Sequence, residues 1–334
     1  MRNQNKLRSK KEIDGQTLAN KIVTGDKVAL SRGITLIEST RIQDARSAEK
    51  LVTACMQHQT PSVRIGITGV PGVGKSTFIE AFGSYLTGIG KKVAVLAVDP
   101  SSSITKGSIL GDKTRMEKLS KDPNAFIRPS PAQDSLGGVA KRTRETIILC
   151  EAAKFDVVLV ETVGVGQSET LVHSMVDFFL LLKLAGAGDE LQGVKRGIME
   201  MADALVINKA DGENIKPVKH AMTEFKRALH LYPPKENSWS AKVTSCSSLN
   251  NVGIDSVWEL ILEFITLTKS NGYFELNRTS QNKNWFLQTV EEQLRHQFFS
   301  QDYVKNHMTE LLVQIEKKAI SPVIAAQKLL ARKS

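Results

Sequence analysis

The sequence predicts an α/β fold in which a parallel sheet is covered by helices on both faces. Between residues 61 and 268, short and continuously apolar segments alternate with longer segments of helical periodicity. Strands of a parallel sheet have this uninterrupted apolar character because both of their faces are buried. The polar residues that could carry chemistry directly follow the apolar segments, which is where an open parallel sheet holds its ligand.

The composition is that of an ordinary globular protein and gives no sign of a membrane segment. The 334 residues are 41% hydrophobic and 24% charged, which suits one large domain with smaller appendages. The longest apolar run, at residues 178–182, lies between Asp177 and Lys183 and is too short to cross a bilayer. The basic N-terminus lacks the apolar segment of a secretory signal.

Cysteine use and charge favour a cytoplasmic protein without a nucleic-acid partner. Cys55, Cys150 and Cys246 lie far apart, show no metal-ligand spacing and suit a reducing compartment. The formal net charge is +10, but the basic residues are spread along the chain and form no recognised nucleic-acid-binding module. We therefore expect a solvated surface with a bias toward acidic partners.

We expect three regions along the chain. Residues 1–60 carry apolar positions at helix-like intervals and are interpreted as a helical N-terminal extension packed on the main domain. Residues 269–334 are expected to begin with a polar linker at 271–284 and to continue as helices over 285–330. This tail is too small for a core of its own, and its pattern is equally compatible with a dimerisation arm and with a lid on the same subunit. In the α/β domain between them, at 61–268, strands are predicted at 63–68, 93–98, 156–160, 177–184 and 204–207.

A glycine-rich loop after the first of these strands matches the pattern G-x-x-x-x-G-K-[ST] without a mismatch. Its glycines let backbone N–H groups converge on one anion, and the helix N-terminus that follows adds partial positive charge. The lysine would reach the β- and γ-phosphates, and the serine hydroxyl would bind Mg²⁺. The alternative is a strand–helix turn that holds no ligand. The residues that we predict to hold the phosphates are Gly69, Val70, Pro71, Gly72, Val73, Gly74, Lys75, Ser76 and Thr77.

Guanine is the base that the sequence predicts. Asn208-Lys209-Ala210-Asp211 follows a predicted strand and matches N-K-x-D. The two oxygens of the Asp211 carboxylate suit the N1–H and 2-amino donors of guanine, a pair that adenine does not offer. The Lys209 stem would cover the plane of the base. Farther on, Ser245-Cys246 resembles a T-S-A loop that touches the guanine oxygen, with Cys246 in the alanine position.

Acidic residues near the predicted strand ends are candidates for direct or water-mediated contact with Mg²⁺. Besides Ser76, these are Asp99, Glu161 and Asp112, because Mg²⁺ prefers hard oxygen ligands. The stretch from Glu161 to Gly164 has the form of a switch that senses the γ-phosphate through the Gly164 N–H. For each carboxylate the alternative is a helix cap or a solvated loop, and this alternative is strongest for Asp112.

Hydrolysis requires a positioned water and positive charge at the transition state. In small signalling GTPases a glutamine follows the switch glycine, whereas this chain has Val165 there. We therefore expect slow intrinsic hydrolysis that self-association or a partner improves. Lys195 and Arg115 could provide the positive charge, although both could equally be surface residues. Lys75 and Glu161 complete the predicted catalytic set.

Several long strings of this chain resemble one family closely. They are GVPGVGKST at 69–77, VDPSS at 98–102, GDKTRM at 111–116, ETVGVGQSE at 161–169 and GAGDELQGVKRGIME at 186–200. Together they resemble the MeaB/ArgK family, the GTPase chaperones of methylmalonyl-CoA mutase, over roughly residues 15–330. Ala185 stands where a proline is usual, and Cys246 replaces alanine, but neither position contacts phosphate in the family pattern.

The resemblance implies a homodimeric GTPase that binds GTP or GDP with Mg²⁺ and has a helical N-terminal extension. It also implies that the C-terminal helices form a dimerisation arm. The implied partner is an adenosylcobalamin-dependent acyl-CoA mutase whose cofactor loading the protein gates and which it protects, with cobalamin adenosyltransferase as a further possible partner. On the family pattern, Asp99, Asp112 and Glu161 belong to Mg²⁺ and γ-phosphate switches. Gln192 and Lys195 belong to a further switch that signals nucleotide state to the mutase.

Three other functions fit the sequence less well. A nickel metallochaperone GTPase would need soft or imidazole ligands at its dimer interface, but no Cys-x-His or His-rich stretch occurs. A kinase or ATPase of a lysine/arginine/ornithine transport system would need ATP and a phosphoacceptor, and Asp211 argues against ATP. A module that only binds nucleotide would lack switches, whereas Asp99, Glu161 and Gly164 are present.

Overall fold

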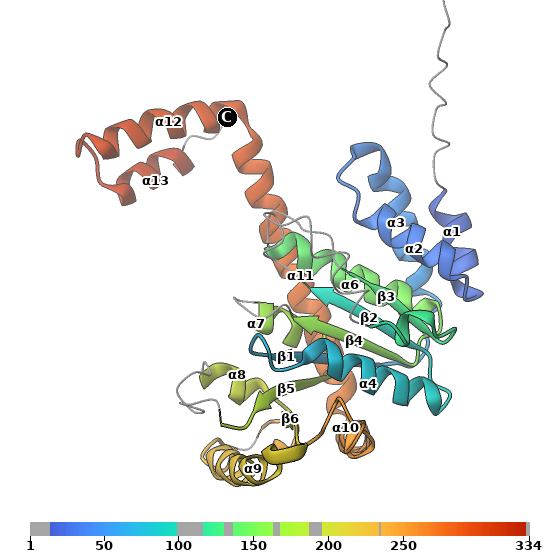
Figure 1. The fold of residues 1–334 in the computed structure, drawn as a ribbon. Coiled ribbons are helices and arrows are strands. Elements are labelled where there is room, and N and C mark those ends of the chain that lie inside the picture. Colours follow the sequence, from blue (N-terminus) through green and yellow to red (C-terminus); the bar gives the residue numbers. More distant parts are fainter. Residues whose placement is uncertain are drawn as a thin grey trace, which may run out of the picture. The chain divides into compact units, whose positions relative to one another are not determined.

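A computed structural model describes residues 14–98, 116–129, 136–162, 168–186, 196–233 and 235–331. The chain divides into two compact units, Met1–Thr279 and Ser280–Ser334. Figure 1 shows the helices and strands along the chain.

The first unit is built on a parallel seven-stranded sheet with the order β3-β2-β4-β1-β5-β6-β7. Its central strand β1 pairs with β4 on one side, where Ile67 lies opposite Glu161, and with β5 on the other. The sheet confirms the predicted α/β class. The strands are β1 Val63–Gly69, β2 Val93–Val98, β3 Ala125–Arg128, β4 Val157–Thr162, β5 Phe178–Leu184, β6 Ala204–Asn208 and β7 Lys242–Ser245.

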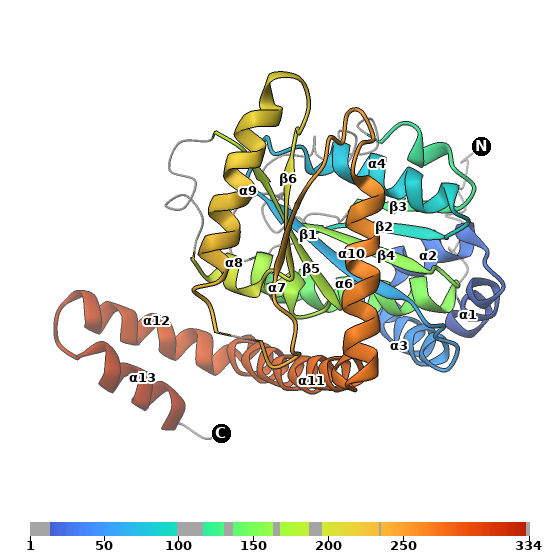
Figure 2. The same cartoon turned by 90° about the horizontal axis from the view of Figure 1, so that it is seen from below.

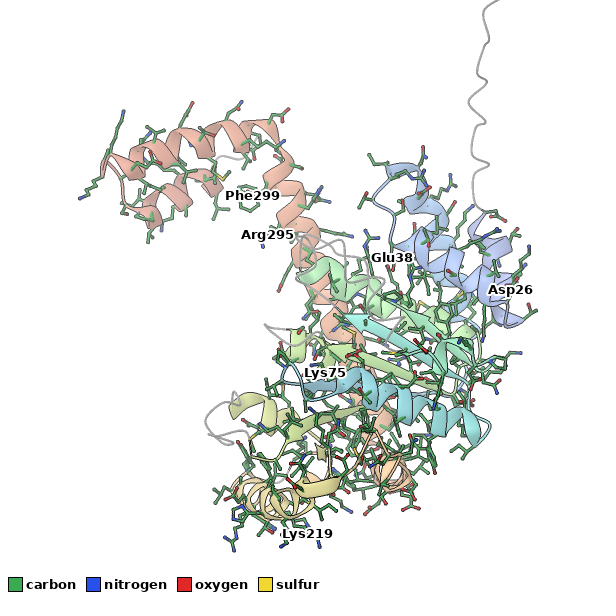
Figure 3. The ribbon with its side chains drawn as sticks, viewed as in Figure 1. Asp26, Glu38, Lys75, Lys219, Arg295 and Phe299 are labelled. Carbon is green, nitrogen blue, oxygen red and sulfur yellow. The ribbon has the colours of Figure 1, made fainter. Side chains whose placement is uncertain are left out.

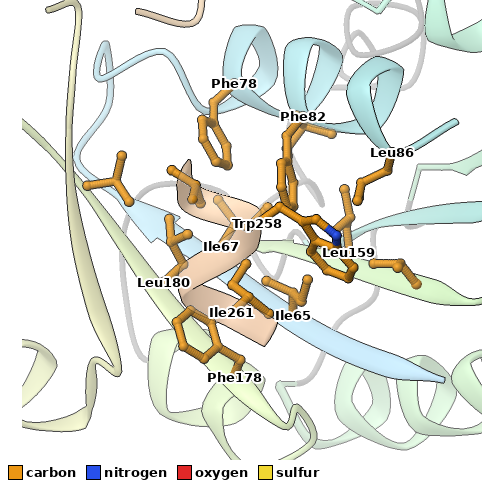
Figure 4. Close-up of a cluster of buried hydrophobic side chains, with 14 of the residues drawn as sticks. Ile65, Ile67, Phe78, Phe82, Leu86, Leu159, Phe178, Leu180, Trp258 and Ile261 are labelled. Atoms are coloured by element: carbon orange, nitrogen blue, oxygen red, sulfur yellow. The ribbon is translucent and has the colours of Figure 1, made fainter. Parts of the chain in front are cut away.

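Helices cover both faces of this sheet. On one face, α4 (Lys75–Gly88) and α10 (Ile254–Ser270) place Phe78, Phe82 and Trp258 on the inward side chains of β1, β4 and β5 (Figure 4). The other face is covered by α6 (Leu136–Ala152), α7 (Ser168–His173), α8 (Arg196–Met201) and α9 (Ile215–Leu229) (Figure 2). Right-handed crossovers account for this arrangement, because α4 leads from β1 to β2 in one direction along the sheet, whereas α6, α7, α8 and α9 lead between strands in the opposite direction.

The N-terminal residues from Gly15 onward are helical, as predicted. They form α1 (Gly15–Val23), α2 (Lys27–Ile37) and α3 (Ile42–Met56). The Asp26 carboxylate caps α2 by accepting the N–H groups of Val28 and Ala29 at 2.8 and 3.0 Å. Gly33 of α2 is closely surrounded, because a Cβ there would lie 3.0–3.2 Å from side chains of α1, α3 and α6.

Two strands and the first part of one helix were not anticipated. β3 and β7 are only four residues long, too short for an alternating apolar pattern to identify them as strands. The predicted linker at 271–284 is wrong, because α11 (Tyr273–Ser300) begins directly after Gly272, whose φ of +77° forms the turn that follows α10. Tertiary contacts decide this helix, since Phe274 is buried in the core.

The second unit contains the end of α11, α12 (Asp302–Glu316) and α13 (Pro322–Ala331). Val304, Leu311 and Ala325 are buried there, whereas many other apolar side chains are exposed. Among the described residues, no helix has both the length and the hydropathy needed to cross a membrane.

Candidate nucleotide site

The loop between β1 and α4, residues 69–76, is called the P-loop below. Gly72 and Gly74 have φ values of +81° and +91°, in the left-handed region that side chains with a Cβ rarely adopt. At Gly74 a Cβ would also lie 2.8 Å from the side-chain nitrogen of Asn208. The helix begins at Lys75, so Lys75, Ser76 and Thr77 form the first turn of α4. The strand, loop and helix predicted around this motif are therefore present.

Lys75, at the start of α4 (Figure 3), donates from Nζ to the Gly69 carbonyl oxygen of the P-loop at 2.7 Å. Burial lowers the pKa of Lys75 below its usual value, while the nearby carboxylates of Glu161 and Glu169 act in the opposite direction. The ammonium is thus held, partly desolvated, over a loop whose conformation suits an anion. A phosphate oxygen would be a stronger partner for it than a carbonyl.

Asn208, the last residue of β6, is bonded to the P-loop. Its Nδ2 donates to the Val73 carbonyl oxygen at 2.9 Å. Its Oδ1 accepts the hydroxyl of Ser248 at 2.7 Å and the backbone N–H of Lys209 at 2.8 Å. Asn208 is almost fully buried, so these bonds hold the end of β6 against the phosphate-binding loop.

Lys209 and Asp211 form the side of the site where a base would lie. Lys209 has a φ of +59°, and its Nζ donates to the Gly72 carbonyl oxygen at 3.0 Å, so its stem extends from β6 to the P-loop. The Asp211 carboxylate accepts the Ser247 hydroxyl. This bond holds the carboxylate in place and leaves it able to accept the two donors of a guanine.

Ser245 and Cys246 lie beside Lys209 and Asp211. Ser245 pairs with Ile207 in the sheet, and the Cys246 carbonyl oxygen accepts the N–H of Ala210 at 3.0 Å. Burial raises the pKa of the Cys246 thiol to about 11, so the thiol is neutral. Ser247 and Ser248 were missed, although the run of hydroxyl residues after Ser245 could have indicated side chains that orient Asn208 and Asp211.

Glu161 lies inside β4, one residue before its end, rather than beyond the strand as the sequence suggested. Its side chain is buried, and the neighbouring Thr162 donates to the Thr68 hydroxyl of β1 at 2.8 Å. A buried carboxylate close to Lys75 and a serine hydroxyl on the first turn of α4 are hard oxygen donors. This donor set fits Mg²⁺, which completes its shell with water and phosphate oxygens.

The structure brings together the P-loop, Glu161, Asn208-Lys209, Asp211 and Ser245-Cys246, all near the carboxyl ends of parallel strands. Five predicted site residues lie outside the described residues: Asp99, Asp112, Arg115, Gly164 and Lys195.

Known proteins resemble this chain over nearly its whole length. Residues 30–303 match the family model described as Methylmalonyl Co-A mutase-associated GTPase MeaB. The GTPase ArgK of Escherichia coli is 46% identical over 93% of this chain and 95% of its own. The mitochondrial methylmalonic aciduria type A homolog of Mus musculus is 41% identical over 92% of this chain and 77% of its own. A solved structure described as a LAO/AO transport system kinase aligns with a TM-score of 0.77 and 36% identity, over 95% of this chain and 96% of its own.

Proposed function

The chain belongs to the MeaB family of methylmalonyl-CoA mutase-associated GTPases, and we propose that it is a GTP-dependent chaperone of an adenosylcobalamin-dependent acyl-CoA mutase. Hydrolysis of GTP is the activity of the family. In the proposed role, the nucleotide state gates cofactor loading into the mutase and protects the mutase from inactivation. The observation that supports the nucleotide-binding part of this proposal is that Asn208 bonds the P-loop to the residues proposed to select guanine.

We assign the nucleotide contacts to residues that the fold gathers. The N–H groups of the P-loop and the start of α4 would hold the β- and γ-phosphates. Lys75 would exchange its carbonyl partner Gly69 for a phosphate oxygen. Asp211 would select guanine. Mg²⁺, when bound, would neutralise phosphate charge. Ser76 and Glu161 would hold it, and Asp99 and Asp112 are further candidates outside the described residues.

Hydrolysis is proposed to depend on segments outside the described residues. Gly164 would report the γ-phosphate, and Arg115 or Lys195 would add positive charge at the transition state. We expect the partner to stimulate turnover by contacting these segments. Lys195→Ala is expected to leave GTP affinity unchanged, measured by calorimetry, while lowering partner-stimulated turnover. A large loss of GTP affinity would instead make Lys195 a direct ligand.

The C-terminal unit is proposed to mediate homodimerisation. Several of its apolar side chains are exposed, and such a surface on a monomer is a common sign of a protein contact. Light scattering of the full chain and of a Leu294→Glu variant tests this, with a dimer expected for the first and a smaller species for the second. The most exposed of these side chains are Phe286, Leu287, Leu294, Leu312, Val323 and Leu330.

The mutase partner is tested by capture on the immobilised full-length protein with a non-hydrolysable GTP analogue, GDP or no nucleotide. Mass spectrometry of the retained proteins is expected to identify an acyl-CoA mutase, with cobalamin adenosyltransferase as a second candidate. The Lys75→Met variant is the matched control, since it should retain the same proteins in all three conditions. Recovery of no mutase in any condition would remove the chaperone role and leave the GTPase.

A kinase role is the second candidate, because the solved relative carries that description. It requires transfer of a γ-phosphate to a protein acceptor rather than to water. Incubation with γ-labelled GTP and γ-labelled ATP separates the two roles. We expect labelled inorganic phosphate from GTP, no labelled protein, and little reaction with ATP because Asp211 has no donor pair to accept from adenine.

A further inference from the structure

Two buried aspartates occupy matching positions at the amino ends of two strands, opposite the nucleotide site at the carboxyl ends. Asp177 directly precedes β5, and Asp203 directly precedes β6. Asp177 accepts the backbone N–H of Arg64 in β1 at 2.8 Å, and Asp203 accepts the backbone N–H of Phe179 in β5 at 2.9 Å. Each carboxylate is therefore fixed to the neighbouring strand as well as to its own.

Each aspartate also follows a short helix that comes after a predicted switch. α7 begins after residues 163–167 and ends shortly before Asp177, and α8 begins after residues 187–195 and ends shortly before Asp203. A shift of either helix would therefore displace the aspartate that follows it. The two helices also contact each other.

One basic side chain binds each aspartate. Arg278 of α11 donates from Nε and Nη2 to the two oxygens of Asp177, both at 2.7 Å, and from Nη2 to the Ser62 carbonyl oxygen at 2.9 Å. Such a bidentate pair has a restricted geometry and holds its two elements in one orientation. The guanidinium also stacks on Phe274, with 4.6 Å between its carbon and the ring centroid.

Lys235 is the basic residue that binds Asp203. Its Nζ donates to the Asp203 carboxylate at 2.8 Å and to the Met201 and Ala202 carbonyl oxygens, at the C-terminal end of α8, at 2.9 and 2.8 Å. This cation therefore completes the hydrogen bonding of the helix end, as a C-terminal cap does.

The loop that contains Lys235 is hydrogen-bonded to the turn before α11. The Asn237 carbonyl oxygen accepts the side-chain N–H of Asn271, in the turn between α10 and α11, at 3.0 Å. The Trp239 indole of the same loop donates to the Asp203 carbonyl oxygen at 2.8 Å. Asp177, four residues after α7, is thus bonded to Arg278 of α11, and the loop that caps α8 is bonded to the turn that precedes α11.

A cavity of about 1330 Å³ lies beside the Arg278–Asp177 and Lys235–Asp203 pairs. The elements that would have to move relative to one another, α7, α8 and the start of α11, therefore do not fill the space between them. Small displacements of the short helices there need not force a collision of packed side chains. The cavity lining includes residues of both pairs, of the loop that contains Lys235 and of the first turn of α11: Asp177, Met201, Asp203, Lys235, Asn237 and Tyr273.

We propose that Arg278 and Lys235 are positioning residues that couple the two nucleotide-dependent segments to the first turns of α11. The inference rests on the proposed function, because it takes the segments before α7 and α8 to be switches. α11 is continuous from Tyr273 to Ser300, so it extends from the first unit into the second. The nucleotide state would therefore reach the helix that leads into the C-terminal unit.

The test is amide hydrogen exchange of the full-length protein, read by mass spectrometry for residues 273–279, with GDP and with a non-hydrolysable GTP analogue. In the wild-type protein we expect the exchange rates in the two states to differ by at least about threefold. Arg278→Lys keeps the charge but loses the bidentate bond, and Lys235→Gln loses the charge at a partly exposed site. Either variant should reduce the difference to less than half, with basal GTP hydrolysis within about twofold of wild type.

Arg295→Gln is the matched control, since Arg295 is an exposed arginine of the same helix (Figure 3), and it should retain the wild-type difference. Thermal unfolding of each variant shows that it is folded. The inference is overturned if residues 273–279 exchange equally in both nucleotide states of the wild-type protein, or if Arg278→Lys and Lys235→Gln keep the full difference. Failure to bind GTP at all would instead overturn the proposed nucleotide site.

Discussion

The side-chain nitrogen of Asn208 lies 2.9 Å from the carbonyl oxygen of Val73, which bonds the end of β6 to the P-loop. The two residues are 135 positions apart in the sequence. Through this contact, a base held by the residues after Asn208 and a phosphate held by the P-loop would bind to one rigid assembly.

Asn208→Ala is expected to weaken GTP binding by about tenfold to a hundredfold, because it frees a buried carbonyl oxygen and loosens Ser248. Calorimetric titration with GTP measures the loss. Asn214→Ala is the control, since Asn214 is exposed and its side chain does not cap α9. Equal affinity of wild type and Asn208→Ala would show that the P-loop holds its conformation without β6.

Lys75→Met is expected to lower GTP affinity by more than about a hundredfold without lowering the melting temperature of the nucleotide-free protein. Burial depresses the pKa of Lys75, so the charged ammonium is held at a cost to folding that methionine does not incur. Calorimetry and thermal unfolding measure the two effects. Lys216→Met, at an exposed position of α9, should change neither, and a clear drop in melting temperature for Lys75→Met would contradict the argument.

Asp211→Asn is expected to exchange guanine preference for xanthine preference, because the amide offers a donor where the carboxylate offered an acceptor. Competition between GTP and XTP in a hydrolysis assay measures the change. Ser247→Ala removes the hydroxyl that Asp211 accepts and should weaken GTP binding without exchanging the preference. Unchanged discrimination in Asp211→Asn would place the base elsewhere.

The free energy of unfolding is expected to fall as the pH is lowered through 6.5, partly because of His173. Burial against Phe179 lowers the pKa of His173 below its ordinary 6.5, with Lys235 acting in the same direction and Asp203 against it. The unfolded chain then binds the proton more readily, so the stability present above pH 6.5 is lost toward the folded-state pKa. Urea unfolding between pH 5 and 8 should show a shallower slope for His173→Gln, whereas the exposed His220→Gln should keep the wild-type slope.

Gly33→Leu is expected to lower the free energy of unfolding of the N-terminal helices by about 2 kcal/mol, because three side chains surround the position. Limited proteolysis within residues 15–56 should become faster, and GTP binding should be retained. Gly88→Leu provides the comparison, since it lies in α4 with no atom within 4 Å of the added Cβ. Equal proteolysis of both variants would mean that α2 is not packed as described.

Local patterns were enough for much of the fold and of the site. β2 was predicted to the residue, because a continuous apolar run between polar residues reports a strand buried on both faces. The P-loop and the sequence after β6 were also predicted, since each function depends on residue types at fixed neighbouring positions. The short strands β3 and β7 and the start of α11 were missed, because few of their residues carry a periodic apolar signal.

The sequence by itself determined the class of the fold, the guanine-nucleotide motifs and the family that they resemble, because these depend on residues adjacent in the chain. Only the tertiary structure decided that Asn208 bonds Val73, that Ser247 holds Asp211 and that Arg278 pairs with Asp177. The partners in each long-range bond depend on strand order and helix packing. A hydrogen bond is directional and acts over about 3 Å, so its formation depends on how distant segments are brought together in space.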